Sequence, residues 1–256
     1  MKRVRSLARR PARTRLGLFL AEGPQSVREA VHHRPDLVRE LYVTASATNR
    51  YAALLTEARQ RGVAVVSVSD EVLAAMADTD TPQGLLAVCA LPTATLERVL
   101  AAGPRLVCVL AQVRDPGNAG TVLRGADAAG ADAVVVTDNS VDVFGPKVVR
   151  SAAGSTFHLP VVTGVSLDAA VVGLRDAGLR VLAADGAGER LLGEVDLAAP
   201  HAWVLGNEAW GLDEADRARC DETVRVPIYG LAESLNLAMA ATVCLYASAA
   251  AQQSST

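Results

Sequence analysis

The sequence contains no long apolar run and has few cysteines and few aromatic residues. Half of its 256 residues are apolar, yet only 4% are aromatic, and there are four cysteines. The longest apolar runs reach about half of the roughly 20 residues that a membrane-spanning helix needs, so no membrane association is expected. The apolar stretch 16–21 is shorter than the core of roughly 7–15 residues in a secretory signal, so no signal peptide is expected.

The cysteines and histidines show no spacing typical of a disulfide framework or a metal site. The four cysteines form no C-x-x-C pair and lie mostly in apolar runs. This pattern favours reduced, buried thiols in a cytoplasmic protein. No metal is expected either, because none of the histidines has ligand spacing. They are His32, His33, His158 and His201.

Charge is distributed unevenly along the chain. The whole chain has 25 Lys and Arg against 28 Asp and Glu, which gives a net charge of −3. Residues 1–15 form a basic arm with seven cationic side chains and no acid, so the remaining 241 residues carry a net −10. This asymmetry predicts a phosphate-rich partner and excludes a uniformly cationic, histone-like protein.

Short β-branched runs alternate with Ala- and Leu-rich helical patterns along the whole chain, which predicts an α/β fold with a mainly parallel sheet. A first domain is expected at residues 16–92. Its predicted strands are 38–43, 63–68 and 85–90. Residues 93–104, rich in Pro, Thr and Ala, are expected to be a linker with one short helical pattern.

A second, larger domain is expected at residues 105–256. Its predicted strands are 106–111, 133–137, 158–162, 179–183, 202–205 and 223–226. Its predicted helices are 119–129, 147–153, 167–177 and 235–251. The last helix is apolar on nearly every face, so it is expected to be buried on all sides, in the core and against a second subunit.

The first of three notable loops, residues 114–124, reads Arg-Asp-Pro-Gly-Asn-Ala-Gly-Thr-Val-Leu-Arg and leads from a buried strand into a helix. Loops at the carboxyl ends of parallel strands are where α/β proteins bind ligands. Taken alone, Asn118 also fits a helix N-cap and Arg124 a solvated helix residue. A dinucleotide-binding fingerprint fits poorly, because G-x-G-x-x-G is absent.

The other two loops also follow predicted strands. In loop 204–212 two glycines flank Asn207 and Glu208, which fits a plain tight turn or a close approach of the backbone to a ligand. In loop 226–237 Ser234 is a suitable N-cap for the last helix. Asn236 would lie in the first turn of that apolar helix and needs a polar partner if buried, since an unpaired amide costs about 1–3 kcal/mol.

Together the loops read N-x-G-x-x-x-R, G-N-E-x-x-G-L and V-P-I-x-G-x-x-x-S-L-N-L. In this order and spacing they resemble the three motifs of the SpoU (TrmH) family, RNA ribose 2'-O-methyltransferases of the SPOUT superfamily. The similarity covers residues 105–250 and extends to the segment 146–160 between the first two motifs. There Ala152 stands where the family often has a hydroxyl residue. More weakly, the amino-terminal block resembles a small substrate-binding domain.

The resemblance implies an α/β fold in which a trefoil-knotted SPOUT methyltransferase domain follows a small α/β/α RNA-binding domain. It also implies S-adenosylmethionine as the cofactor and a homodimer formed through the knotted domain. The cofactor contacts are expected to be largely main-chain. The residues expected to make them are Leu205, Gly206, Asn207, Val226, Pro227, Ile228 and Leu235.

The resemblance further implies catalytic roles for Arg124, Asn118, Glu208, Ser234 and Asn236. Arg124 is expected to stabilise the developing alkoxide and the neighbouring phosphate, because a pKa above about 12 makes arginine a poor base. Asn118 is expected to orient Arg124 or the ribose, and Glu208 to anchor Arg124 or the third loop. Ser234 and Asn236 are expected to hydrogen-bond the ribose and the cofactor-binding loops.

The expected function is methyl transfer to a ribose 2'-hydroxyl of 23S ribosomal RNA, as in the large-subunit enzymes of actinobacteria that the chain resembles. Two alternatives remain open. One is an RNA-binding or ribosome-assembly factor that kept the fold without methyl transfer. The other is an RNA methyltransferase acting on a base nitrogen, which would use a carboxylate base. The sequence identifies neither the target nucleotide nor a housekeeping or antibiotic-resistance role.

Overall fold

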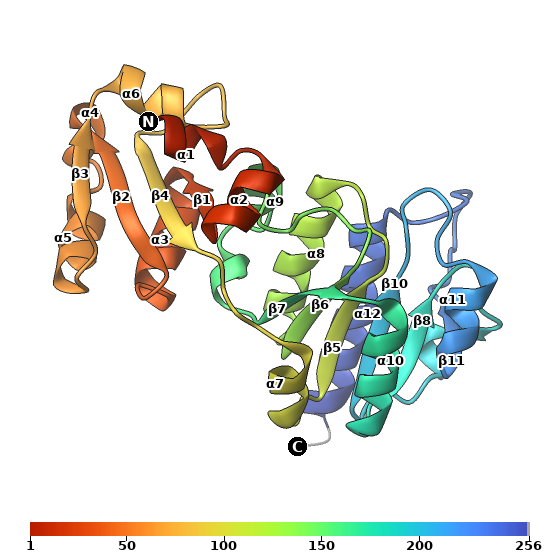
Figure 1. The fold of residues 1–256 in the computed structure, drawn as a ribbon. Helices are drawn as coiled ribbons and strands as arrows, with labels where there is room; N and C mark the ends of the chain where they lie inside the picture. The colour runs from red at the N-terminus through yellow and green to blue at the C-terminus, as the bar shows by residue number, and fades with distance from the viewer. Residues whose placement is uncertain (255–256) are drawn as a thin grey trace. The chain divides into compact units, whose positions relative to one another are not determined.

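A computed structural model describes residues 1–254 and divides the chain into two compact units (Figure 1). Unit 1 comprises Met1–Pro92 together with Asp142–His158. Unit 2 comprises Thr93–Val141 and the chain from Leu159 onward. The first boundary between the units, after Pro92, therefore lies at the predicted end of the first domain. The segment Asp142–His158, however, belongs to unit 1 instead of the second domain. The last two residues of the predicted second domain lie outside the described residues.

Unit 1 contains a four-stranded sheet in the order β1–β4–β2–β3. Its strands are β1 (Leu18–Glu22), β2 (Val38–Thr44), β3 (Val65–Val68) and β4 (Leu85–Ala90). β4 runs antiparallel to both β1 and β2, whereas β2 and β3 are parallel. Three of these strands match the predicted ones. β1 was not predicted, because its short apolar run passes directly into helix α3.

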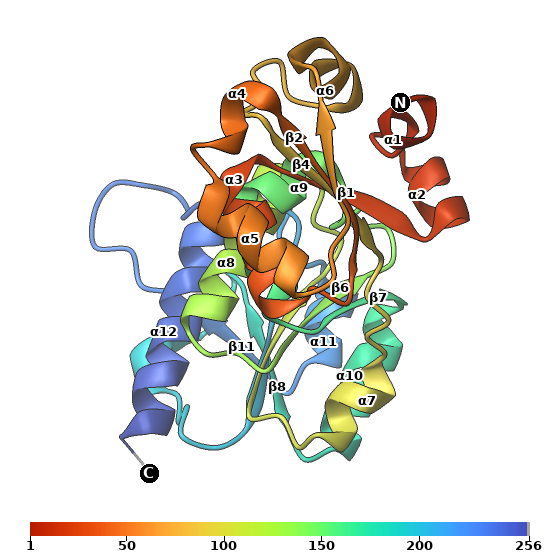
Figure 2. The same ribbon diagram turned by 90° about the vertical axis from the view of Figure 1, so that its left-hand side faces the viewer.

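Helices cover both faces of this sheet (Figure 2). They are α1 (Lys2–Ser6), α2 (Arg10–Leu16), α3 (Gly23–His33), α4 (Ala45–Thr48), α5 (Ala52–Gln60), α6 (Asp70–Met76) and α9 (Pro146–Ser151). On one face Val4 and Leu7 share a core with Leu73 and Met76 of α6. On the other, α3 and α9 pack against β1. This is the α/β/α arrangement expected for the amino-terminal block.

The basic arm is folded, which corrects the prediction of a separate segment at residues 1–15. Val4 and Leu7 are buried, so α1 is part of the core. Arg13 is also buried and donates from Nε to Asp142 Oδ2 at 3.1 Å and from Nη1 to the Leu7 carbonyl at 2.7 Å. Arg3 pairs with both carboxylate oxygens of Glu40, at 2.7 and 2.8 Å. The remaining five cationic side chains are exposed. They are Lys2, Arg5, Arg9, Arg10 and Arg15.

Unit 2 contains a seven-stranded sheet in the order β7–β6–β5–β10–β8–β11–β9, with every pair parallel. The strands are β5 (Leu106–Leu110), β6 (Ala133–Thr137), β7 (Val161–Val165), β8 (Arg180–Ala184), β9 (Arg190–Leu191), β10 (His201–Leu205) and β11 (Glu222–Arg225). β5, β6 and β10 are buried along their whole length, as expected for central parallel strands covered on both faces. β7 starts later than predicted, because His158 is the C-cap of the short 3-10 helix η1 (Ser155–Phe157) and Val161 is the first residue in register with β6.

Two layers of helices enclose this sheet (Figure 2). α8 (Pro116–Ala128) and α12 (Leu237–Gln253) pack together on one face, and α7 (Leu96–Ala101), α10 (Leu167–Asp176) and α11 (Glu214–Arg219) lie on the other. Because α7 packs against α10, the predicted linker is part of unit 2. α12 buries Ala241 and Cys244 but exposes Met239, Val243 and Tyr246. Among the described helices none is long and apolar enough to cross a membrane.

Candidate active site

The carboxyl ends of β8, β10 and β11 border a cleft of about 500 Å³ in unit 2. This volume falls within the roughly 300–1,000 Å³ of small-molecule and cofactor sites. Six of the seven residues expected to hold the cofactor line the cleft, and Pro227 does not. The six are Leu205, Gly206, Asn207, Val226, Ile228 and Leu235. Glu208 and Ser234 line it as well.

The loop that follows β10 is held in shape by its own contacts. Asn207 and Gly211 exchange two backbone hydrogen bonds of 2.9 Å. The Asn207 side chain donates to the Gln112 carbonyl at 2.8 Å and accepts from the Ala209 amide at 2.8 Å. A Cβ at position 206 would lie 2.3 Å from the Gly211 carbonyl. Gly206 is therefore needed for the packing of the loop itself, before any ligand is considered.

Asp185, which the sequence analysis missed, also belongs to this cleft. It follows β8, and its carboxylate accepts hydrogen bonds from the Leu212 amide at 3.0 Å and the Ala187 amide at 2.9 Å. A Cβ at Gly211, where φ is +67°, would lie 2.6 Å from Asp185 Oδ2. Asp185 thus fixes two of the loops around the cleft. Its position directly after a buried parallel strand was the available signal.

Glu208 binds the start of α8 and not Arg124. Its carboxylate accepts from the Arg114 amide at 3.1 Å, the Asp115 amide at 3.0 Å and the Asn118 side chain at 3.4 Å. The expected contact between Glu208 and Arg124 is absent among residues 1–254. Asp115 caps α8 through a 2.7 Å bond from the Asn118 amide, so Asn118 is not the N-cap. The Asn118 side chain is thereby left available for other partners.

Asn236 links this cluster to the third loop. Its side-chain nitrogen donates to Asn118 Oδ1 at 3.0 Å. Its side-chain oxygen accepts from the backbone amides of Ala238 at 2.9 Å and Met239 at 3.4 Å, so Asn236 is the N-cap of α12. The alternative reading of Ser234 as the cap of this helix is therefore wrong. Glu208, Asn118 and Asn236 form one hydrogen-bonded chain across all three loops, which we call the three-loop chain.

Arg124 stands apart from the three-loop chain. It is exposed on α8, does not line the cleft, and makes no side-chain hydrogen bond or ion pair within the described part of the chain. Ser234 lines the cleft but is exposed. Near the same loops the guanidinium of Arg114 lies 5.7 Å from the ring centre of the exposed Trp210. The structure thus joins three of the five expected catalytic residues directly.

The thiols do not supply a nucleophile. All four cysteines are free, and burial raises the pKa of Cys220 to about 11 and that of Cys244 to about 12. Burial raises the pKa of Cys89 and Cys108 as well. Since the thiolate is the reactive form of cysteine, these side chains are unreactive at neutral pH.

A parallel sheet with ligand loops at its carboxyl edge, and three loops joined by hydrogen bonds, agree with a methyltransferase domain of the SPOUT type. The chain belongs to the SpoU rRNA Methylase family, whose sequence profile matches residues 105–246. The profile of the MRM3-like substrate binding domain matches residues 1–87. The predicted family, the α/β methyltransferase fold with an amino-terminal substrate-binding domain, and the RNA-methyltransferase activity are confirmed.

Relatives resemble the chain over nearly its whole length. The 23S rRNA (guanosine(2553)-2'-O)-methyltransferase RlmP of Bacillus subtilis is 36% identical over 96% of this chain and 94% of its own. The 23S rRNA (uridine(2479)-2'-O)-methyltransferase of Streptomyces viridochromogenes is 34% identical over 94% of this chain and 85% of its own. The crystal structure of the SpoU methyltransferase AviRb from S. viridochromogenes, in complex with AdoMet, matches with a TM-score of 0.88 and 32% identity over 99% and 97% of the two chains.

Proposed function

We propose that the chain transfers the methyl group of S-adenosylmethionine to a ribose 2'-hydroxyl of 23S ribosomal RNA. The observation that carries this proposal is the three-loop chain, which lies beside the cleft and holds the three family motifs in one arrangement. Relatives named as 23S rRNA 2'-O-methyltransferases support the substrate. Their names agree with neither the assembly-factor nor the base-methylation alternative. The trefoil knot and a cytoplasmic location are parts of the same proposal.

The cleft fits S-adenosylmethionine in size and in its lining. The cleft of about 500 Å³ is bordered on one side by the loop after β10, whose backbone is held by hydrogen bonds from Asn207 and to Asp185. Main-chain groups of residues 205–208, together with those of Val226, Ile228 and Leu235, would hold the cofactor. Any side chain in place of the Gly206 hydrogen would displace this backbone. When bound, S-adenosylmethionine supplies an activated methyl group on a sulfonium.

The side chains around the cleft would then orient the ribose and stabilise charge. Arg124, free of intramolecular ion pairs among the described residues, would contact the 2'-oxygen and an adjacent phosphate of the RNA. Its guanidinium stays protonated, so the hydroxyl proton leaves to phosphate or water. A fixed positive charge beside the developing alkoxide lowers the barrier. Ser234 would hydrogen-bond the ribose, and the three-loop chain would position the first turn of α8.

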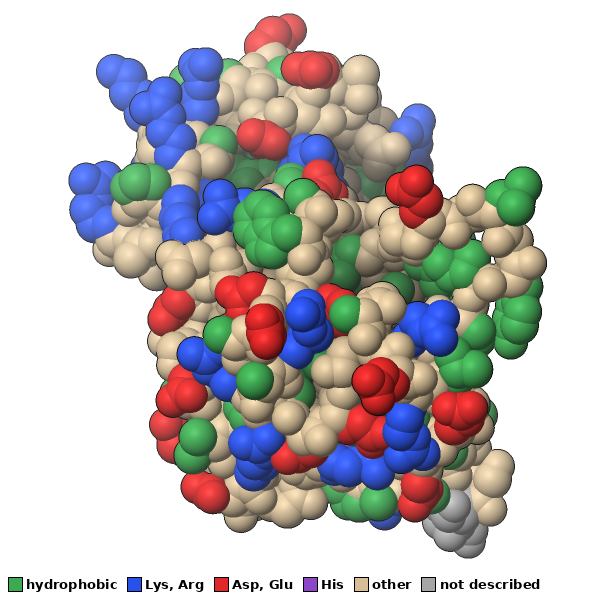
Figure 3. Space-filling model, turned by 90° about the vertical axis from the view of Figure 1, so that its right-hand side faces the viewer, with side chains coloured by type: hydrophobic (Ala, Val, Ile, Leu, Met, Phe, Trp, Pro, Cys, Tyr) green, Lys and Arg blue, Asp and Glu red, His purple; other side chains and the backbone are tan. Residues whose placement is uncertain are grey.

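Unit 1 would supply much of the RNA affinity. Figure 3 shows Lys and Arg side chains gathered over α1 and α2. The five exposed cations of residues 1–15 make no ion pair among the described residues, so they are available to phosphates. Neutralising phosphates makes affinity strongly salt-dependent, whereas selectivity for RNA comes from its shape and single-stranded loops.

A homodimer through unit 2 is part of the proposal. Apolar side chains are exposed on the loop after β11, where Tyr229 is 93% exposed, and on the neighbouring α12. Figure 3 shows the hydrophobic side chains along this projecting loop. Large apolar side chains exposed on neighbouring elements are typical of an interaction site. The surface consists of Ile228, Tyr229, Leu231, Met239, Val243 and Tyr246.

Methyl transfer from labelled S-adenosylmethionine tests the proposal. The full-length protein should be incubated with deproteinised ribosomal RNA and, separately, with assembled large subunits. The RNA is then digested and its nucleosides are separated. Label in a 2'-O-methylated nucleoside of 23S RNA is expected. Label in a base-methylated nucleoside would establish the base-nitrogen alternative, and absence of label from both substrates would favour the assembly factor.

A further inference from the structure

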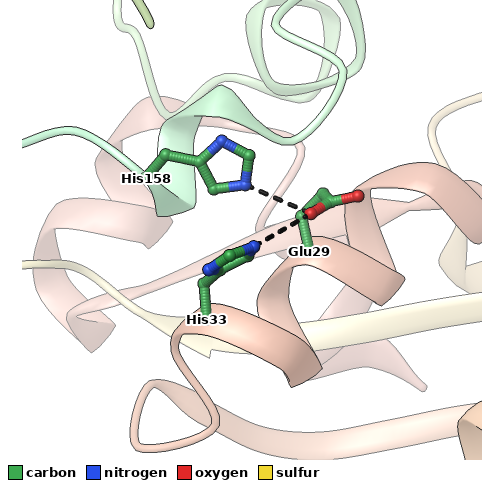
Figure 4. A group of neighbouring side chains, drawn as sticks. All are labelled: Glu29, His33 and His158. Carbon is green, nitrogen blue, oxygen red and sulfur yellow. Dashed lines mark hydrogen bonds and ion pairs between the residues drawn. The ribbon is translucent and has the colours of Figure 1, made fainter. Parts of the chain in front are cut away.

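Three side chains in unit 1 form a second polar cluster, which we call the Glu–His cluster. Glu29 and His33 lie one turn apart on α3, and His158 follows η1. The Nε2 atom of His158 lies 3.2 Å from Glu29 Oε2, and that of His33 lies 3.4 Å from the same oxygen. Figure 4 shows both rings turned toward this carboxylate. We propose that the Glu–His cluster binds a divalent transition-metal ion of the zinc class.

The distances fit such an ion. Zinc bound tetrahedrally at about 2.0–2.1 Å places its ligand atoms about 3.3–3.4 Å apart. The two distances to Glu29 Oε2 already have these lengths. The three ligand atoms all lie within 4.8 Å of one another, so the two ring nitrogens would have to approach each other to about 3.3–3.4 Å on binding the ion. A fourth position would be left for water.

The donor set selects the kind of ion. Two imidazoles and one carboxylate match the ligands of zinc and its first-row neighbours. Magnesium and calcium prefer sets made up of oxygen atoms, so they are poor candidates. Each histidine presents Nε2 to the same carboxylate oxygen.

The surroundings hold the carboxylate in place. Gln25 donates from Nε2 to Glu29 Oε1 at 3.0 Å, which leaves Oε2 for the two histidines. Such outer hydrogen bonds orient metal ligands. Gly154, with φ of +106°, packs so closely that a Cβ there would lie 2.3 Å from Glu29 Cγ. The side chain of Glu29 is only 17% exposed, so the first ligand is already held in position.

The ion would connect two parts of unit 1 that are distant in sequence. Glu29 and His158 are 129 residues apart in the sequence. His158 is the last residue of the segment Asp142–His158, which belongs to unit 1 although it follows part of unit 2 in the sequence. Ion pairs already attach this segment elsewhere, since Arg13 binds Asp142 and Arg150 binds Glu22. A metal that binds only the folded state would add to the stability of this attachment.

Calorimetric titration of zinc chloride into the tag-free, metal-free full-length protein tests the proposal. One ion per chain is expected, with a Kd of micromolar or lower and a rise in Tm, and magnesium should have no effect. His33→Gln and His158→Gln should each weaken zinc binding at least tenfold. His32→Gln is the matched control, because His32 lies on the same helix but pairs with Glu57 at 3.0 Å. Its zinc affinity should equal that of the wild type.

Two results would overturn the proposal. One is the absence of binding and of any Tm shift at high zinc concentration, and the other is binding that survives both His33→Gln and His158→Gln. If these variants do not fold, cobalt(II) spectra of the wild-type protein give the answer. Tetrahedral bands without a thiolate charge-transfer band are expected. A thiolate band would place the ion at a cysteine and contradict the proposed site.

Discussion

The side-chain amide of Asn236 donates a 3.0 Å hydrogen bond to Asn118 Oδ1, although the two residues are 118 positions apart. The side-chain nitrogen of Asn118 donates to Glu208 Oε1 at 3.4 Å, and the side-chain oxygen of Asn236 caps α12. Asn118 therefore acts as acceptor toward the third loop and as donor toward the second. To hold the three loops together, a side chain at position 118 must both donate and accept a hydrogen bond and must have the length of asparagine.

Asn118→Asp should lower methyl transfer by roughly tenfold or more and leave the protein folded. The change replaces the donor toward Glu208 by a second carboxylate, and like charges at this distance repel. The introduced carboxylate would still accept from Asn236, so a loss of activity isolates the contact with Glu208. Thr121→Ala on the same helix is the control and should keep its turnover. Unchanged turnover of Asn118→Asp would refute the role of the three-loop chain.

Arg124→Ala should fold as the wild type does, because an exposed residue without ion pairs contributes less than about 0.5 kcal/mol to the free energy of unfolding. It should bind S-adenosylmethionine yet lose methyl transfer roughly a hundredfold or more. Arg124→Lys should not restore activity, since lysine lacks the planar fork that can hold two oxygens. Single-turnover kinetics and calorimetry separate the two effects. Near-normal turnover of Arg124→Ala would contradict the proposed mechanism.

Ala240→Phe should weaken binding of S-adenosylmethionine at least tenfold, because Ala240 lines the cleft and a phenyl ring would occupy part of its volume. Ala250→Phe is the matched control on the exposed side of the same helix. Gly206→Val is less informative, since any side chain at position 206 collides with Gly211 and would disturb the loop itself. Equal affinities of the two phenylalanine variants in a calorimetric titration would place the cofactor elsewhere.

The exposed cations of α1 and α2 should determine the salt dependence of RNA binding. Replacing Arg5, Arg9, Arg10 and Arg15 by alanine should reduce the slope of log K against log salt by about 3, at about 0.7–0.9 per phosphate contact. Cofactor binding should not change. Deleting residues 1–15 is a poor test, because it removes Val4 and Leu7 from the core. An unchanged slope in the alanine variant would show that RNA binds another surface.

His201 should make stability fall in acid. It is 1% exposed, and burial lowers its pKa, despite hydrogen bonds to the Ala199 carbonyl and to Ser248. The unfolded chain, with a histidine pKa of about 6.5, then binds the proton first, so stability is lost as pH falls below about 6.5. Urea unfolding between pH 7.5 and about 5 should show this slope. His201→Gln should reduce this dependence of stability on pH, whereas His32→Gln should leave it unchanged. Equal pH dependence in the wild type and in His201→Gln would show that His201 is not the responsible group.

Much of the fold could be predicted because its signals are local. Continuous β-branched runs mark the central strands of unit 2, and their order along the chain predicts the parallel sheet. The return of Asp142–His158 to unit 1 was not predictable, because it depends on long-range contacts such as Arg150 with Glu22. The basic arm was misjudged for a related reason. Val4 and Leu7 lie among many cationic residues, and two apolar residues are too few to form a recognisable hydrophobic pattern.

For the candidate site, the motifs predict which residues to consider but not how these residues contact one another. The motifs identify Glu208, Asn118 and Asn236, but spacing cannot show that Glu208 binds the start of α8 instead of Arg124. The sequence offers Ser234 as a suitable cap of α12 although Asn236 is the actual cap, because both Ser and Asn are good N-caps and only geometry distinguishes them. Asp185 was missed, because a single carboxylate after a strand gives a weak signal in a chain with many acids.

Mapping of 2'-O-methyl groups across ribosomal RNA tests whether this chain methylates a ribose of 23S RNA. RNA should be compared from cells that carry the wild-type protein, cells that lack it and cells that carry only Arg124→Ala. We expect a ribose position in 23S RNA that is methylated in cells with the wild-type protein and unmethylated in the other two. Identical maps from all three, or a lost methyl group on a base, would contradict it.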